Sequence, residues 1–294
     1  MNGIARALTI AGSDCSGGAG IQADLKTFHR FGVFGQSAVT AVVAENTLGV
    51  QGWQRVDPDM VRMQIDSCLG DIGADAVKTG MLVDREVVQA VARGLRDHGA
   101  SALVVDPVMR AKGGDALIDP EAVEALVREV FPLALVVTPN VPEAEVLAGR
   151  VMDGPEAVRR VAEAIGAMGP RYVLLKGGHA RFGDPRLSVD LLWDGTDLLE
   201  LPGPRFSDRN THGTGCTYSA AITAWLARGC DVVGAVRRSR AFLVEAIRSG
   251  PGLGGGHGPV NHWAVLPDDL GSATDPAGQA AGSDRPHGRE SGAG

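Results

Sequence analysis

The stretch Ala7-Leu8-Thr9-Ile10-Ala11-Gly12-Ser13-Asp14 decides the fold, because it joins a short apolar run to a polar, glycine-containing turn. An apolar run of this length that ends at turn residues predicts a buried strand. The glycine-rich turn continues to Gly20, and a helix is predicted to begin near Ala19. It has neither a G-x-G-x-x-G register nor a P-loop pattern, so its glycines favour a small substrate lying against bare backbone.

The same alternation of strand and helix continues along most of the chain. Five further apolar runs predict buried strands, and amphipathic segments lie between them. This alternation predicts an α/β fold, a three-layer α/β/α sandwich whose mainly parallel central sheet is covered by helices on both faces. The predicted strands are 38–43, 75–78, 102–105, 133–137 and 172–175, and the helical segments include 58–69, 85–96 and 120–130.

Two parts of the chain depart from this alternation. Residues 187–193 and 197–201 flank Asp194-Gly195-Thr196 and predict a β-hairpin at the sheet edge. We expect residues 1–267 to form a single domain. Residues 268–294 are rich in Gly, Ala, Ser, Pro and charge, so we predict a disordered C-terminal tail.

Composition excludes several classes of protein. The chain of 294 residues has no run of 18 apolar residues, and its first residues pass directly into a strand-like segment, so we expect no membrane span, no signal peptide and a cytoplasmic location. A net charge of −7 argues against a nucleic-acid partner. The four cysteines lack the spacing of a zinc site and are expected to be free thiols.

Polar or glycine-containing segments follow the predicted strands. In a sheet of this kind ligands bind at the carboxyl ends of the strands. Six strand ends are therefore predicted to converge on one cleft. The segments are Gly12-Ser13-Asp14, Glu45-Asn46-Thr47, Thr79-Gly80-Met81, Asp106-Pro107-Val108-Met109, Thr138-Pro139-Asn140 and Lys176-Gly177-Gly178-His179.

The segment Thr211-His212-Gly213-Thr214-Gly215-Cys216-Thr217 precedes a helix of small and apolar residues. Its glycines allow successive backbone N–H groups to point into one concavity, and the helix adds its positive N-terminus, so the segment predicts an anion site. Cys216 falls in the first turn, where the same field is expected to lower the pKa of its thiol. The alternative is a helix cap with a buried cysteine behind it.

Only four of the 28 basic residues are lysines, namely Lys26, Lys78, Lys112 and Lys176. In a chain that otherwise uses arginine, a lysine marks a site where a compact ammonium is needed. Lys112 and Lys176 each precede a glycine pair, which favours phosphate contacts, whereas Lys26 is expected on a solvated helix face. The segment around Lys112 is a candidate flap over the phosphates, or else an ordinary surface loop.

Three acidic residues and one amide complete the candidate site. Asn140 and Glu143 stand three residues apart at a strand-to-helix junction, a spacing that suits a hydrated Mg²⁺ or, alternatively, a capping box. Asp106 ends the neighbouring strand, and hard oxygen ligands beside an anion site indicate a nucleoside triphosphate. Asp24 lies one turn into the first helix and faces either the pocket or solvent.

These motifs together resemble the hydroxymethylpyrimidine/phosphomethylpyrimidine kinases of the ribokinase-like superfamily, enzymes of thiamine biosynthesis. The resemblance extends from about residue 5 to Trp263 and covers several long motifs in the family's order. They are 8–14, 17–24, 78–81, 105–109, 138–143, 176–179, 212–217 and 256–262.

The resemblance implies a homodimeric kinase that uses ATP and Mg²⁺ to phosphorylate 4-amino-5-hydroxymethyl-2-methylpyrimidine and then its monophosphate. Cys216 is the implied catalytic base, beside an anion hole of Gly213, Thr214 and Gly215. The implied substrate-binding residues are Gly12, Ala19, Asp24, Glu45, Met81 and Val108; the ATP-binding residues are Lys176, Asn140, Lys112 and Thr211; the metal ligands are Asp106 and Glu143.

Glu45 departs from the family pattern, which has glutamine before Asn-Thr. Glutamine donates to a ring nitrogen and accepts from an amine, whereas an ionised glutamate only accepts. Either Glu45 is protonated or it pairs with a protonated pyrimidine, or the preference has moved toward pyridoxal and pyridoxine, which close relatives phosphorylate. A non-catalytic pyrimidine-binding relative is the alternative from another class of protein.

Deleting the residues after Asp269 tests the predicted tail. Because this segment has too few apolar side chains to join a core, the melting temperature is expected to stay unchanged. Thermal unfolding of the full and truncated chains, followed by circular dichroism, measures this. A clear fall in melting temperature would show that the tail packs on the domain.

Overall fold

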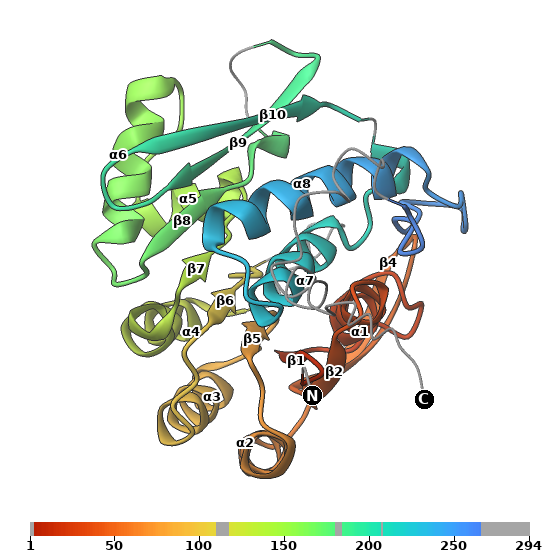
Figure 1. The fold of residues 1–294 in the computed structure, drawn as a ribbon, viewed down its shortest axis with the longest axis vertical. Coiled ribbons are helices and arrows are strands. Elements are labelled where there is room, and N and C mark those ends of the chain that lie inside the picture. Colours follow the sequence, from red (N-terminus) through yellow and green to blue (C-terminus); the bar gives the residue numbers. More distant parts are fainter. Residues whose placement is uncertain (1–2, 110–117, 180–183, 207, 266–294) are drawn as a thin grey trace, which may run out of the picture.

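An eight-stranded sheet forms the middle layer of the protein (Figure 1). The computed structural model describes residues 3–109, 118–179, 184–206 and 208–265. The strand order is β10-β9-β8-β7-β6-β5-β1-β2, parallel from β8 to β2, with antiparallel β9 and β10 at one edge. The strands are β1 (Arg6–Ala11), β2 (Phe34–Val39), β5 (Ala76–Thr79), β6 (Leu103–Val105), β7 (Val136–Val137), β8 (Tyr172–Leu175), β9 (Leu187–Trp193) and β10 (Leu198–Pro204).

Helices cover both faces of this sheet, as the alternation predicted (Figure 1). Successive residues of a strand point to opposite faces. On β6, Leu103 and Val105 pack with one set of helices, and Val104 packs with the other. The first set is α2 (Pro58–Ser67), α3 (Arg85–Asp97), α4 (Pro120–Ala125), α5 (Val141–Ala148) and α6 (Pro155–Gly166); the second is α1 (Gly20–Arg30), α7 (Thr214–Ala227) and α8 (Val232–Arg248).

The predicted helices are confirmed, with differences at their ends. Asp119 caps α4 by accepting a hydrogen bond from the Ala122 amide at 2.8 Å, and proline follows at the first helical position. The helix then continues as a π-helical turn and a short 3₁₀ turn, Phe131–Leu133. This turn occupies the start of the run predicted as strand 133–137, so β7 is reduced to Val136–Val137.

The prediction of one strand over 38–43 is wrong. β2 ends at Val39, and the chain then enters a separate antiparallel ribbon of β3 (Ala41–Asn46) and β4 (Gly49–Arg55). Thr40 fixes the break, because its Oγ1 donates to the Met81 carbonyl oxygen at 2.6 Å. Glu45 therefore lies within a strand of the ribbon and not after a strand of the main sheet.

The predicted edge hairpin is confirmed. β9 and β10 pair in antiparallel register, with Leu198 opposite Trp193. Asp194 stabilises the turn, since its Oδ1 accepts hydrogen bonds from the amides of Thr196 and Asp197 at 2.9 and 2.8 Å. The predicted tail, 268–294, lies outside the described residues.

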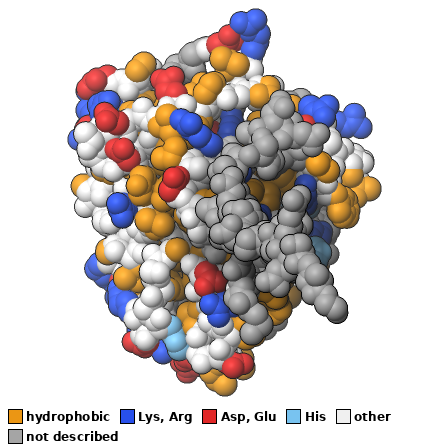
Figure 2. Space-filling model, viewed as in Figure 1, with side chains coloured by type: hydrophobic (Ala, Val, Ile, Leu, Met, Phe, Trp, Pro, Cys, Tyr) orange, Lys and Arg blue, Asp and Glu red, His pale blue; other side chains and the backbone are white. Residues whose placement is uncertain are grey.

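Charged side chains of both signs lie intermixed on the face shown in Figure 2. The part of this face that the structure describes therefore has no continuous basic surface of the kind that a nucleic-acid backbone requires. Within the described ranges, none of the helices combines the length and the apolar character needed to cross a bilayer.

Candidate active site

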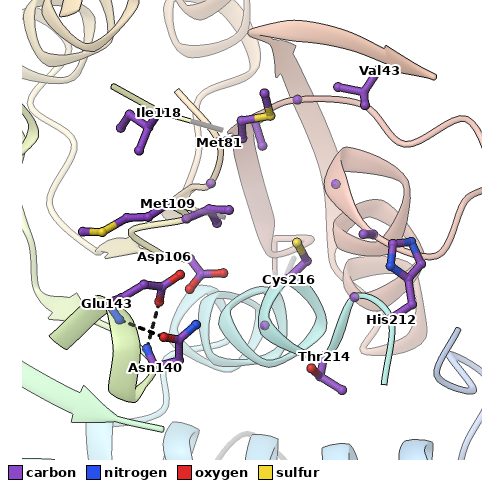
Figure 3. A pocket seen from close by; sticks show the side chains of 18 of the residues that line it. Val43, Met81, Asp106, Met109, Ile118, Asn140, Glu143, His212, Thr214 and Cys216 are labelled. Atoms are coloured by element: carbon purple, nitrogen blue, oxygen red, sulfur yellow. Dashed lines mark hydrogen bonds between the residues drawn. The ribbon is translucent and has the colours of Figure 1, made fainter. Parts of the chain in front are cut away.

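A cavity of about 650 Å³ opens at the carboxyl ends of the parallel strands (Figure 3). The predicted site residues line it with two exceptions. Asp24 does not reach its wall, and Lys112, with the flap predicted around it, lies outside the described residues. The predicted residues that line the cavity are Gly12, Ala19, Glu45, Met81, Asp106, Val108, Asn140, Glu143, Lys176, Thr211, Gly213, Thr214, Gly215 and Cys216.

The N-terminus of α7 faces this cavity. Gly213 is the N-cap residue in a left-handed conformation with φ 75°, and no side chain caps the helix. A Cβ at Gly213 would collide with the carbonyl oxygen of Gly18, so only glycine allows the two loops to approach this closely. The first turn of the helix, including Gly215 and Cys216, lines the cavity, and the free amide groups of a helix N-terminus are suited to an anion.

A buried hydrogen-bond network joins the glycine-rich turn to the loop before α7. Asp14 is fully buried and accepts hydrogen bonds from the amides of Ser16, Gly18 and Ala19 at 2.7 to 3.0 Å. His212 Nε2 lies 2.9 Å from the same carboxylate. Burial acts to raise the pKa of Asp14, but these hydrogen bonds outweigh it and hold the pKa far below its usual range.

Glu45 lies beside this network. Its Oε1 is 3.7 Å from His212 Nε2, and the side chain is largely buried. Burial and the neighbouring charge of Asp14 raise the pKa of Glu45 to about 7. Asp14, Glu45 and His212 offer atoms within 4.8 Å of one another, but the oxygens of Asp14 already accept several hydrogen bonds from within the protein.

A lysine and a carboxylate lie at the opposite side of the cavity. Lys176 Nζ donates to Asp106 Oδ1 at 2.7 Å, and Thr138 Oγ1 donates to the same oxygen at 3.1 Å. Burial acts to lower the pKa of Lys176, but Asp106 and Glu143 raise it, so the ammonium stays charged. This pair places a fixed cation next to the first turn of α7, where Gly215 lies close to Lys176 Nζ.

Asn140 and Glu143 form the capping box that the sequence left as an alternative to metal ligation. The Asn140 side chain accepts from the Glu143 amide at 2.9 Å, and Glu143 Oε2 accepts from the Asn140 amide at 2.8 Å (Figure 3). Both residues nevertheless line the cavity. Burial raises the pKa of Glu143 to about 7, against the opposing charge of Lys176.

The prediction of a lowered thiol pKa at Cys216 is wrong for the protein without ligands. The sulfur points into the cavity, and burial raises the pKa of the thiol to about 12 (Figure 3). The charge of Lys78 acts in the opposite direction, but Asp24 and Asp106 add to the effect of burial. Desolvation therefore outweighs the field of the helix N-terminus.

The placement of Asp24 at the pocket also needs correction. This residue is fully buried, and its Oδ2 accepts from Thr9 Oγ1 at 2.6 Å and from Lys78 Nζ at 2.7 Å. Lys78 itself lines the cavity, although no site role was predicted for it. The scarcity of lysine was the signal that could have found it. Lys26 is exposed, as expected, and donates to the Gly17 carbonyl oxygen.

The three-layer fold and this cavity define the class of protein, a ribokinase-like kinase of small molecules. A family model described as phosphomethylpyrimidine kinase matches residues 14–261. The chain belongs to the phosphomethylpyrimidine kinase family.

Two relatives and one solved structure show how far the similarity extends. The chain is 44% identical to the hydroxymethylpyrimidine/phosphomethylpyrimidine kinase of Bacillus subtilis, over 92% of this chain and 99% of the relative. It is 49% identical to the thiamine biosynthesis bifunctional protein ThiED of Geobacter sulfurreducens over 89% of its length, but spans only 53% of that protein. The pyridoxal kinase of Staphylococcus aureus, solved with AMP-PCP and pyridoxal, matches with a TM-score of 0.82 and 37% identity over 90% of this chain and 95% of that one.

Proposed function

We propose that this protein phosphorylates 4-amino-5-hydroxymethyl-2-methylpyrimidine and then its monophosphate, with ATP as the phosphate donor, in thiamine biosynthesis. The observation that carries the proposal is the position of Cys216. It lies in the first turn of α7, which no side chain caps. The same cavity is lined by the apolar side chains of Met81 and Val108 and by the ion pair of Lys176 and Asp106. The names and the similarity of the relatives support the same substrate class.

Different residues of the cavity bind the ring, bind the phosphates and accept the proton during phosphoryl transfer. The apolar walls around Met81 and Val108 and the bare backbone at Gly12 hold the ring. The amides of Gly215 and Cys216 hold the transferring phosphoryl group, and Lys176 contacts the nucleotide. The substrate oxygen bonds to the γ-phosphorus as the bond to ADP breaks, and Cys216, as the thiolate, takes the hydroxyl proton.

The oxygen donors of the site suit Mg²⁺. Asp106 and Glu143 are buried carboxylates on the cavity wall, and the Asn140 side chain lies near both (Figure 3). Asp106 Oδ1 already accepts from Lys176, and Glu143 Oε2 is used in the capping box, so these groups fit an ion that keeps part of its water shell. When bound, Mg²⁺ neutralises charge on the phosphates.

Pyridoxal kinase is the second candidate function. The fold similarity to the pyridoxal kinase of Staphylococcus aureus and the carboxylate of Glu45 at the ring-binding end favour it as the alternative substrate class. From the family resemblance we also propose a homodimer and a cytoplasmic location, which stay predictions.

An assay with ATP and Mg²⁺ tests the proposed function. Purified protein is incubated with the hydroxymethylpyrimidine, its monophosphate or pyridoxal, and products are measured by mass spectrometry. We expect the pyrimidine mono- and diphosphates. Phosphorylation of pyridoxal alone would select the vitamin B6 alternative, and no phosphorylated product from any of the three would contradict the kinase activity.

Replacing Cys216 by alanine tests its role as the base. We expect kcat to fall by about 10²-fold or more, while ATP binding measured by calorimetry stays nearly unchanged, because the anion site uses backbone amides. Cys230→Ala is the matched control, since Cys230 follows α7 and is absent from the described cavity lining. Near-normal turnover of Cys216→Ala would show that another group accepts the proton.

Replacing Glu45 by glutamine tests how the ring is recognised. A raised pKa means that Glu45 binds its proton below about pH 7 and loses it as the pH rises through that value. For Glu45 to form paired hydrogen bonds with an aminopyrimidine, either its carboxyl group or the ring must carry a proton. Because this proton is lost as the pH rises, the affinity of the wild-type protein for the pyrimidine is expected to fall above about pH 7.

Glu45→Gln supplies a permanent donor and is expected to bind the neutral pyrimidine more tightly, with little change between about pH 6 and pH 8. Calorimetric titrations across this range measure both proteins. Weaker binding by the variant at every pH would show that the carboxylate has a specialised role.

A further inference from the structure

Lys78 forms a buried ion pair in the middle layer of the protein. It lies on the central strand β5, its side chain is 0% exposed, and its Nζ is 2.7 Å from Asp24 Oδ2 on α1. Thr9 on the neighbouring strand β1 donates to the same oxygen at 2.6 Å. Three elements thus fix the position of one ammonium group.

A buried ion pair of this kind adds little to the stability of the fold. Two buried charges lose their hydration, and apolar side chains of similar volume are often as stabilising or more so. The pair is also incompletely satisfied, because Asp24 Oδ1 has no hydrogen-bond partner among the described residues. A buried and incompletely satisfied ion pair next to a ligand cavity indicates a functional use.

Lys78 and Cys216 line the same cavity, and α7, which carries Cys216, packs on β5, which carries Lys78. A Cβ on Gly80 would lie 3.1 Å from Lys78 Nζ, so glycine leaves room around the ammonium. The charged groups that act on the thiol come from four elements or their ends. They are Asp24 of α1, Lys78 of β5, Asp106 after β6 and Lys176 after β8.

The electrostatics of these groups agree with the geometry. Burial acts to lower the pKa of Lys78, but Asp24 and the other anions outweigh it and raise the pKa, so the ammonium is charged throughout the physiological range. Of the charges that act on Cys216, Lys78 has the largest effect and favours the thiolate, against Asp24 and Asp106.

We propose that Lys78, anchored by Asp24 and Thr9, is a positioning residue that holds a positive charge near Cys216, where α7 packs on β5, and stabilises its thiolate. The inference rests on the proposed function only in giving that thiolate a use as the base. There the hydroxyl O–H bond breaks and an S–H bond forms, while the oxygen bonds to phosphorus and ADP leaves with the electron pair. The proton then passes from the thiol to solvent.

The thiol itself reports on this role without substrate or ATP. In the full chain with Cys15, Cys68 and Cys230 replaced by serine, the rate of iodoacetamide alkylation measures the thiolate fraction of Cys216. An opposite charge close to an ionisable group shifts its pKa by about one unit or more, so Lys78→Met is expected to slow alkylation at a fixed pH near neutrality by roughly tenfold or more. In the kinase assay kcat is expected to fall by a similar factor, with KM for ATP nearly unchanged.

The double variant Asp24→Asn/Lys78→Met separates charge from structure. It removes both charges of the pair, so no buried carboxylate is left without its partner. If Lys78→Met does not fold, this double variant serves as the test. Because Lys78 acts on the thiol more strongly than Asp24 does, alkylation is expected to lie between wild type and Lys78→Met, at least about threefold below wild type.

Wild-type alkylation rates and kcat in the double variant would overturn the proposal and leave the ion pair a purely structural role. An unchanged alkylation profile in folded Lys78→Met would overturn it as well. If Lys78→Met is alkylated more slowly but the wild-type protein phosphorylates none of the tested substrates, the coupling of Lys78 to Cys216 is supported and the kinase assignment is contradicted. Failure of the proposal and failure of the proposed function are therefore distinguishable.

Discussion

The carboxylate of Asp14 holds together the two loops on which the whole cavity depends. It accepts amide hydrogen bonds from its own glycine-rich turn and a bond from His212, which lies 198 residues further along the chain. Backbone packs directly on backbone next to this contact, where Gly213 meets Gly18. The N-terminus of α7 is therefore fixed relative to β1, and the proposed anion site depends on the meeting of these two loops.

Burial sets the chemistry of the groups that this arrangement encloses. It raises the pKa of Glu45, Glu143 and Cys216, which line the same cavity. Each shift disfavours negative charge in a site whose substrates, under the proposed function, bring several negative charges of their own. The two lysines oppose this effect, since Lys78 and Lys176 stay charged because carboxylates anchor them.

Much of the fold and most of the cavity follow from the sequence, for a topological reason. Short apolar runs alternating with helical segments allow few arrangements other than a parallel sheet, and such a sheet brings all its carboxyl strand ends to one edge. Gly12, Asp106 and Lys176 were predicted to meet for this reason, and they line one cavity. The break at Thr40 could not be predicted, because a β-branched threonine among apolar residues fits a continuous strand and the break depends on a hydrogen bond to distant Met81.

The errors at Asp24 and Cys216 share a physical cause. Sequence spacing shows which residues stand in a helix's first turns but not how deeply tertiary packing will bury them, and burial decides whether a thiol or carboxylate keeps its charge. Under the proposed function this burial is useful. A base that stays protonated in the open cavity does not abstract protons from water there, so proton transfer is confined to the cavity that holds both substrates.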